Sequence, residues 1–156
     1  MEIRDPIHGD IHIDKLAQEL LDTAAMQRLR NIKQLGFTYL IYPGCVHTRF
    51  DHSLGTYHMA QVLYDKVVTH PDKLDRLALG AAALLHDVGH IPFGHTLEDE
   101  YALYNRHDSK ERLLQVLGLP EVRNVLEEHG VCELVSQILL KELPHEKRYL
   151  SELVSS

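Results

Sequence analysis

The segment from Leu74 to about Gly89 is apolar on almost every face, and it constrains the fold more than any other stretch. Alanine and leucine occupy most positions between Leu77 and Leu85, without the polar stripe that a surface helix carries. A helix that is apolar all round has to be covered on all sides, which makes it the central helix of a bundle. The sequence therefore predicts an all-α fold built around this segment.

The other elements are predicted from periodicity and from residues that start or end helices. Alternating apolar and polar residues around Pro6 and Gly9 predict a short N-terminal β-hairpin. A first helix begins at Lys15, and a second follows Thr23, a candidate N-cap, and stops before Gly36. Residues 36–48 are expected to form a loop, and further helices are expected over about 49–69, 74–89, 108–117, 121–129, 131–142 and 146–153. In the helix over 49–69 the predicted buried stripe is Leu54, Tyr57, Leu63 and Val67.

Composition narrows the class of protein. The 156 residues contain no repeat, low-complexity tract or linker, so we expect a single domain over 1–156. No apolar run approaches the roughly 20 residues that a membrane helix needs. The formal net charge of −7 disfavours general binding to duplex nucleic acid. Cys45 and Cys132 have neither disulfide nor metal-site spacing, which favours free thiols in a reducing cytoplasm.

The central helix delivers His86 and Asp87 next to each other at its apolar end. A buried carboxylate has to be protonated, paired with a cation or bound to a metal. In one reading an arginine satisfies Asp87 and the backbone satisfies His86. In the other, both bind one metal ion as neighbouring corners of its shell, because adjacent helical residues point about 100° apart. Eight of the twelve histidines lie between His47 and His107, and His52 is then the natural third ligand.

A rival metal site has to be considered. His86 and His90 have the spacing H-D-x-x-H, which is close to the H-E-x-x-H signature of zincin metallopeptidases. Aspartate reaches a bound water less well than glutamate does, and Pro92 breaks the helix just beyond His90. Both features weigh against a zincin-like peptidase.

An ordered set of motifs resembles the HD-domain phosphohydrolases, and within them the deoxynucleotide triphosphohydrolase branch. The resemblance covers residues 3 to about 107. The matching segments are Asp5-Pro6-Ile7-His8-Gly9, Asp22-Thr23, Gln27-Arg28-Leu29-Arg30-Asn31-Ile32-Lys33-Gln34-Leu35-Gly36, Tyr42-Pro43-Gly44, His47-Thr48-Arg49-Phe50-Asp51-His52-Ser53-Leu54-Gly55 and His86-Asp87-Val88-Gly89-His90-Ile91-Pro92-Phe93-Gly94-His95.

This resemblance implies a helical HD-domain bundle and a role for each matching residue. It implies that a divalent metal is held by His52, His86 and Asp87. It implies that substrate phosphates meet Arg49, His90, His95 and His107. It implies that Gln34 and Leu35 contact the deoxyribose, and that Asp22, Gln27 and Arg30 match a regulatory guanine-nucleotide site of the vertebrate member. Donors of this kind do not distinguish Mn, Fe, Mg, Zn, Co and Ni.

Two further side chains bear on these roles. The spacing of Gln27, Arg30 and Gln34 puts all three on one face of the second predicted helix, which suits a ligand-facing stripe and equally an exposed one. Glu98 lies three residues beyond His95 and could orient an imidazole.

The sequence departs from the family pattern at its C-terminal end. The fourth metal ligand of the family is a downstream aspartate, and no aspartate follows Asp108. We therefore expect the domain to be C-terminally incomplete relative to the family, or inactive, or completed by a glutamate such as Glu133 or Glu152. An incomplete domain leaves apolar surface open, so we also expect a homo-oligomer.

Three functions follow from these patterns. The leading one is metal-dependent hydrolysis of a nucleotide phosphoester, with a dNTP converted to deoxynucleoside and triphosphate. The second is a catalytically inactive module that binds nucleotide or mediates oligomerisation. The third is the zincin-like peptidase.

Overall fold

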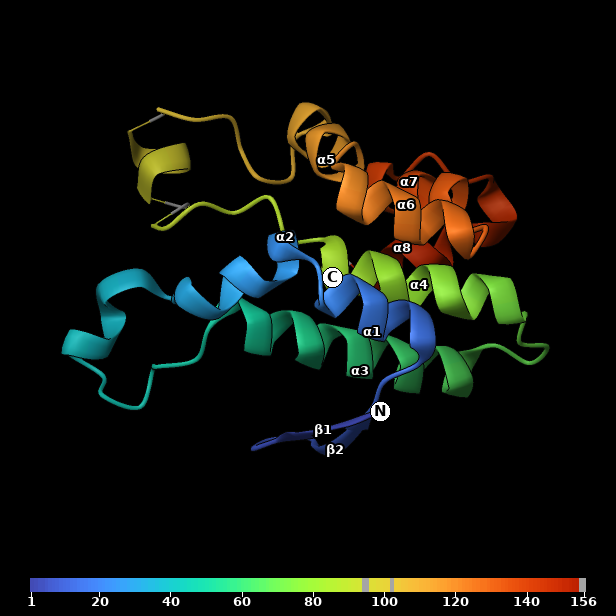
Figure 1. Cartoon of the computed structure of the whole chain (residues 1–156), viewed down its shortest axis with the longest axis horizontal. Helices are drawn as coiled ribbons and strands as arrows, with labels where there is room; N and C mark the ends of the chain where they lie inside the picture. Colours follow the sequence, from blue (N-terminus) through green and yellow to red (C-terminus); the bar gives the residue numbers. More distant parts are fainter. Residues whose placement is uncertain (94–95, 102, 155–156) are drawn as a thin grey trace.

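The computed structural model describes residues 1–93, 96–101 and 103–154, and its helices surround one central helix (Figure 1). The α-helices are α1 (Lys15–Leu21), α2 (Ala24–Gln27), α3 (Arg49–Val67), α4 (Lys73–Leu85), α5 (Lys110–Leu117), α6 (Pro120–Glu128), α7 (Cys132–Leu140) and α8 (Tyr149–Val154). Shorter turns are η1 (Arg28–Asn31), η2 (Gly36–Leu40) and η4 (His145–Lys147), with a π-helical turn, η3 (Thr96–Glu100). The strands are β1 (Glu2–Asp5) and β2 (Gly9–His12).

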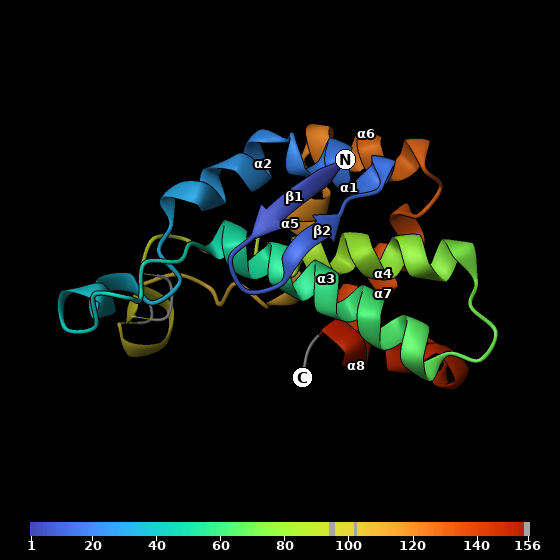
Figure 2. The ribbon, with the colours of Figure 1, turned by 90° about the horizontal axis from the view of Figure 1, so that it is seen from below.

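Helix α4 is the central helix that the sequence predicts. It packs against α1, α3, α7 and α8, and its side chains from Ala78 to Leu85 are buried. Helix α3 runs alongside it in the opposite direction (Figures 1 and 2). The two helices pack closely at Gly80, where an added Cβ would lie 2.5 Å from Gln61 Nε2 and 2.8 Å from Tyr57 Cε2. This antiparallel pair brings the start of α3 next to the end of α4.

The N-terminal hairpin covers one side of this pair (Figure 2). Strands β1 and β2 pair antiparallel with Ile3 opposite Ile11, and Ile11 is fully buried in the main core. Asp5 Oδ1 closes the turn by accepting hydrogen bonds of 2.8 Å from the backbone N–H groups of Ile7 and His8. The predicted all-α fold with a short N-terminal hairpin is confirmed.

Three details differ from the sequence predictions. Helix α4 ends at Leu85, four residues earlier than expected, so His86 and Asp87 occupy the turn that follows it. The second predicted helix gives way to the 3-10 turn η1 after Gln27, and Ile32 is extended, so Gln34 does not continue the helical face of Gln27. The loop over 36–48 contains the 3-10 turn η2.

The buried stripe of α3 is also rotated from the one predicted. Leu54 and Tyr57 are buried, but Leu63 and Val67 are 37% and 61% exposed. The inward positions farther along the helix are Ala60, Gln61 and Tyr64, because α4 and α8 lie against that side. None of the helices in the described ranges combines the length and the apolar character that crossing a membrane requires.

Candidate metal centre

Two helix ends bring the predicted ligands together. Helix α3 begins at a capping box in which Thr48 accepts from the backbone N–H of Asp51, and Asp51 accepts from the N–H of Thr48. This box fixes the first turn of α3, which carries His52. His86 and Asp87 follow the last turn of α4, which ends beside that first turn.

The spacing of the three donor groups fits a single metal ion. His52 Nε2 lies 3.2 Å from His86 Nε2 and 3.5 Å from Asp87 Oδ2, and His86 Nε2 lies 3.5 Å from Asp87 Oδ1. Donors bound about 2.1 Å from one ion are roughly 3.0 Å apart in octahedral geometry and roughly 3.4 Å apart in tetrahedral geometry. The observed separations fall close to these values, so the side chains present suit a divalent cation.

The His86 ring is oriented for this role by the helix that precedes it. Its Nδ1 lies 2.8 Å from the carbonyl oxygen of Ala83. A carbonyl can only accept, so Nδ1 carries the proton and Nε2 keeps the lone pair. A metal-binding histidine usually donates its other ring N–H in this way.

Arg49 and Asp87 form a buried ion pair at the centre of the site. Arg49 Nη1 donates to Asp87 Oδ2 at 2.8 Å, and the two side chains are 3% and 9% exposed. Burial alone would raise the pKa of Asp87, but the hydrogen bond from His90 and the charges of His86, His90 and Arg49 hold it well below its usual value. The side chain of Asp87 is therefore ionised at neutral pH.

The two contacts expected in the absence of a metal are therefore both present: Arg49 pairs with Asp87, and the carbonyl of Ala83 accepts from His86. They do not exclude a metal, because His86 Nε2 and Asp87 Oδ1 still face the centre.

Two further histidines stand beside the ion pair. His90 is 1% exposed, and its Nε2 lies 3.5 Å from Asp87 Oδ1. Burial lowers the pKa of His90 to about 4, although the hydrogen bond with Asp87 opposes this, so the ring is neutral at pH 7. The His107 ring stacks on it with 3.5 Å between centroids. Asp87, His90 and His107 form a second group of donor atoms close enough for one ion.

Glu98 orients His107, as the sequence suggested for an imidazole in this region. Its Oε2 accepts hydrogen bonds of 3.0 Å from both the backbone N–H and Nδ1 of His107. Burial would raise the pKa of Glu98, but these two bonds hold it below its ordinary value. A buried carboxylate therefore faces the His107 ring.

A cavity of about 1340 Å³ opens beside the metal-binding groups. Its walls include the hairpin turn, the face of α3 that carries Asp51, His52, Gly55, Thr56 and Met59, and the ends of α7 and α8. The predicted site residues in its wall are His52, His86, Asp87 and His107. Gln34 and Leu35 are not among the wall residues, and neither are Arg49 and His90, which are both buried. His95 lies outside the described residues.

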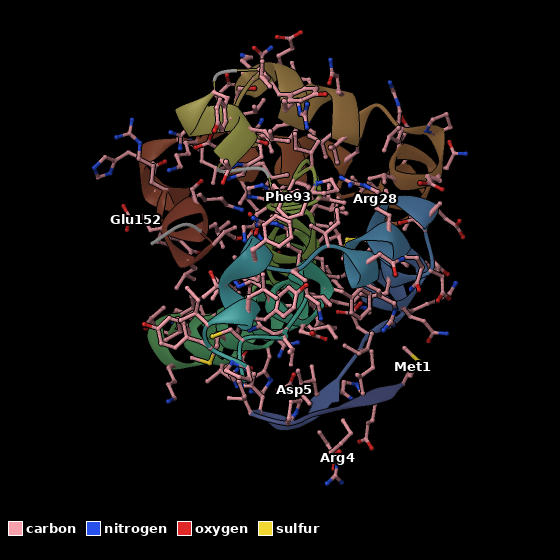
Figure 3. The ribbon with its side chains drawn as sticks, turned by 90° about the vertical axis from the view of Figure 1, so that its left-hand side faces the viewer. Met1, Arg4, Asp5, Arg28, Phe93 and Glu152 are labelled. Atoms are coloured by element: carbon pink, nitrogen blue, oxygen red, sulfur yellow. The ribbon has the colours of Figure 1, made fainter. Side chains whose placement is uncertain are left out.

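The residues of the predicted regulatory site lie near one another on α1, α2 and η1. Gln27 donates to the carbonyl of Leu21, next to the exposed Asp22, and accepts a 2.9 Å bond from Arg30 Nε. The Arg30 guanidinium also stacks 3.6 Å above the Phe50 ring. The two glutamates considered as a fourth ligand differ. Glu152, labelled on α8 in Figure 3, is one of the residues that line the cavity. Glu133 accepts a hydrogen bond from Gln137 on α7.

The zincin-like arrangement is not formed. It needs His86 and His90 one turn apart on a continuous helix, and α4 ends at Leu85. His86 is instead grouped with His52 and Asp87, and His90 with Asp87 and His107.

These observations define a class: an all-helical protein with a His–Asp centre suited to a divalent metal, held between the ends of two antiparallel helices. The model of the HD domain family matches residues 49–153. The chain belongs to the HD domain family.

Relatives with sequence similarity include characterised and uncharacterised proteins. The human deoxynucleoside triphosphate triphosphohydrolase SAMHD1 is 32% identical over 186 residues, covering 99% of this chain and 30% of that protein. The uncharacterised protein YwfO of Bacillus subtilis is 40% identical over 159 residues, covering 98% of this chain and 36% of that protein. The chain spans about a third of the length of these two relatives.

A solved structure supports the same assignment. A phosphohydrolase of Bacteroides thetaiotaomicron superposes with a TM-score of 0.83 at 36% identity, covering 100% of this chain and 38% of that one. A hypothetical protein of Aquifex aeolicus gives a TM-score of 0.81 at 33% identity, covering 99% of this chain and 42% of that one.

Proposed function

We propose that this chain forms the metal-binding part of a metal-dependent phosphohydrolase that converts a dNTP to deoxynucleoside and triphosphate. The observation that carries the proposal is the triad of His52, His86 and Asp87, whose donor atoms lie 3.2–3.5 Å apart. The similarity to proteins named as a phosphohydrolase and as a dNTP triphosphohydrolase supports the choice of reaction and substrate.

In the proposed reaction a water oxygen bonds to the α-phosphorus of the nucleotide. The bond from that phosphorus to the 5′ oxygen of the deoxyribose breaks. The attacking water gives up one proton and the 5′ oxygen takes up one, so that the products are the deoxynucleoside and triphosphate. A divalent ion in the triad would supply positive charge to a phosphate oxygen and lower the pKa of a bound water.

The chain's own residues would then divide the remaining tasks. Arg49 keeps Asp87 ionised, and its buried Nε has no hydrogen-bond partner among the described residues. A shift of the Arg49 side chain toward the cavity would let this Nε donate to a phosphate oxygen. His90 is neutral at pH 7 and suits the acceptor that orients the attacking water. His107 lines the cavity, and Glu98 holds its ring through Nδ1, which suits a role as proton donor to the 5′ oxygen.

The other predicted residues stay proposals. Gln34 and Leu35 are proposed to contact the deoxyribose, and His95 the phosphates. Asp22, Gln27 and Arg30 are proposed as a regulatory nucleotide site, for which the bond from Arg30 to Gln27 supplies a preformed polar pair. Assembly into a homo-oligomer is likewise proposed.

The test begins with metal content. The purified chain should retain a divalent metal, His52→Gln should lose it, and His12→Gln, which changes an exposed histidine of β2, should retain it. With Mn²⁺ or Fe²⁺ and a dNTP, deoxynucleoside and triphosphate should form in equal amounts. The same assay should be run on the chain extended by the corresponding C-terminal segment of the Bacillus subtilis relative. Absence of both products from the extended protein would refute hydrolysis.

A second candidate function is supported by the donor count. Among the described residues, the group around His52 contains three candidate ligands, two histidines and one aspartate, and no second carboxylate completes it as a fourth. An inactive nucleotide-binding module would show a rise in Tm with dNTP but no product in either protein.

A further inference from the structure

The turn that follows Asp87 is held by two arginines from different parts of the chain. Arg28, in η1, donates from Nη2 to the carbonyls of Val88 and His90, at 2.5 Å and 2.6 Å. Arg112, in α5, donates from Nη2 to the carbonyl between them, that of Gly89, at 2.6 Å. Three consecutive carbonyls are therefore bound by two guanidinium groups, 60 and 23 residues away from their partners in sequence.

Positively charged side chains are favourable partners for the carbonyls of this turn. The turn extends from the C-terminal end of a 13-residue helix, where the peptide dipoles leave partial negative charge. Val88, Gly89 and His90 are buried, so their carbonyls need protein donors, and charged donors bind more strongly than neutral ones.

The two arginines stay close together although they repel each other. Both line a hollow of about 500 Å³ between α2, α5 and the turn. Burial and, after it, the charge of Arg112 lower the pKa of Arg28. Neither guanidinium has a carboxylate partner among the described residues. The carbonyls of the turn are the partners that both arginines share. Figure 3 labels Arg28 next to the ribbon of α2 and η1.

The turn contains His90, whose ring lies between Asp87 and His107. The His90 ring contacts Asp87 Oδ1 at 3.5 Å and stacks on His107. Gly89 lies against the backbone of His107, since an added Cβ would come within 3.2 Å of its carbonyl oxygen. A displacement of these carbonyls would therefore move the His90 ring relative to both neighbours.

We propose that Arg28 and Arg112 are positioning residues that clamp residues 88–90 and so hold His90 between Asp87 and His107. Neither arginine touches the metal-binding atoms, and their effect on the reaction is transmitted through the backbone of the turn. The catalytic consequence of this clamp rests on the proposed hydrolysis, but the clamp itself can be tested without turnover.

The experiment compares Arg28→Gln, Arg112→Gln and the double variant with Arg123→Gln as the matched control. Arg123 is an exposed arginine of α6 paired with Glu127. Ring NMR signals of ¹³C-labelled histidine are recorded at pH 8, and hydrogen exchange is measured for the peptide containing residues 86–91. The His90 signal should shift in each clamp variant as the stack with His107 is lost. Exchange should rise about 10-fold or more when a charge-assisted bond is removed, and the control should show neither change.

Kinetics of the extended protein give the second readout. Misplacement of a supporting group typically lowers activity by about 10-fold to 100-fold. We expect this loss in kcat with little change in KM, and a double variant no worse than the poorer single variant, because both arginines hold one turn. Arg28→Lys keeps a cationic donor and should recover part of the loss. If a Gln variant does not fold, Arg28→Lys and Arg112→Lys replace it in the same measurements against the control, with smaller changes expected because a cationic donor remains.

Unchanged His90 signals and exchange in the double variant would overturn the clamp. A shifted His90 with unchanged kcat would overturn its positioning role. If the wild-type protein hydrolyses no dNTP, the proposed function fails, and the NMR and exchange results still decide the clamp.

Discussion

Replacing Arg49 with methionine should destabilise the metal-free protein strongly, because it leaves the Asp87 carboxylate buried without its cation. At the observed 2.8 Å, two unit charges attract by about 6 kcal/mol at an effective dielectric constant of about 20. Desolvation of both groups offsets part of this attraction, and breaking a buried pair from one side typically costs about 3–5 kcal/mol. For a chain of this size that loss lowers Tm by on the order of 10 °C.

The matched control is Arg76→Met. Arg76 also forms an ion pair, in which two hydrogen bonds join it to Asp65, but the two side chains are 43% and 51% exposed. Exposed pairs contribute about 1 kcal/mol or less. Urea unfolding with EDTA should therefore separate the two variants clearly.

Metal should reduce the difference in unfolding free energy between the Arg49→Met protein and the wild type, because an ion bound to Asp87 replaces the missing positive charge. Repeating the unfolding with Mn²⁺ should stabilise the Arg49→Met protein more than the wild-type protein. If Arg49→Met in EDTA costs no more than Arg76→Met, Asp87 is not an uncompensated buried carboxylate, and the reasoning is wrong. An equal effect of Mn²⁺ on both proteins would show that the metal does not bind at Asp87.

Other substitutions test the packing and the titration of the site. Gly80→Ala should cost about 1–3 kcal/mol in urea unfolding, since its Cβ would lie 2.5 Å from Gln61 Nε2, whereas Gly44→Ala, with no atom within 4 Å, should be nearly neutral. Burial and the bonds from His107 act in opposite directions on Glu98, and the net result is a pKa below its ordinary value of about 4.3. Ionised Glu98 thus adds stability above that pH, and this is lost as pH falls through the lower, folded pKa, so Glu98→Gln should flatten the acid limb of a stability–pH curve measured from pH 6 to 3. Light scattering should show concentration-dependent association of the chain, and a monomer at the highest concentrations would count against the proposed oligomer.

Local sequence signals predict much of the scaffold and the position of the triad. The helix expected over about 49–69 does begin at Arg49, and the apolar segment before His86 marks the central helix. Two helices joined by a short connection must run antiparallel, so a histidine at the start of one meets a His–Asp pair at the end of the other. The grouping of His52 with this pair could therefore be expected before the geometry was known.

Features set by distant partners were not predictable in this way. The period of α3 fits several apolar stripes, and the packing of α4 and α8 decides that Tyr64 is inside and Leu63 outside. The sequence does not mark the end of α4 at Leu85, because the first glycine after it is Gly89, four residues farther on. The sequence does not indicate the contacts of Arg28 and Arg112 with the turn, because their partners are backbone carbonyls, which every residue has.

The position of the triad at the open end of the α3–α4 pair has a consequence for the unfolded chain. The connection after Val67 joins the two helices at one end, and a metal shared by His52 and His86 would join them at the other, 34 residues apart in sequence. Such an ion acts as a reversible cross-link. By the chain-entropy relation used for disulfides, closing a loop of this length stabilises the folded state by about 4 kcal/mol. Chelation would then loosen the helix pair from its metal end, so the same ion that is proposed to serve the reaction also limits how far the two helices can separate.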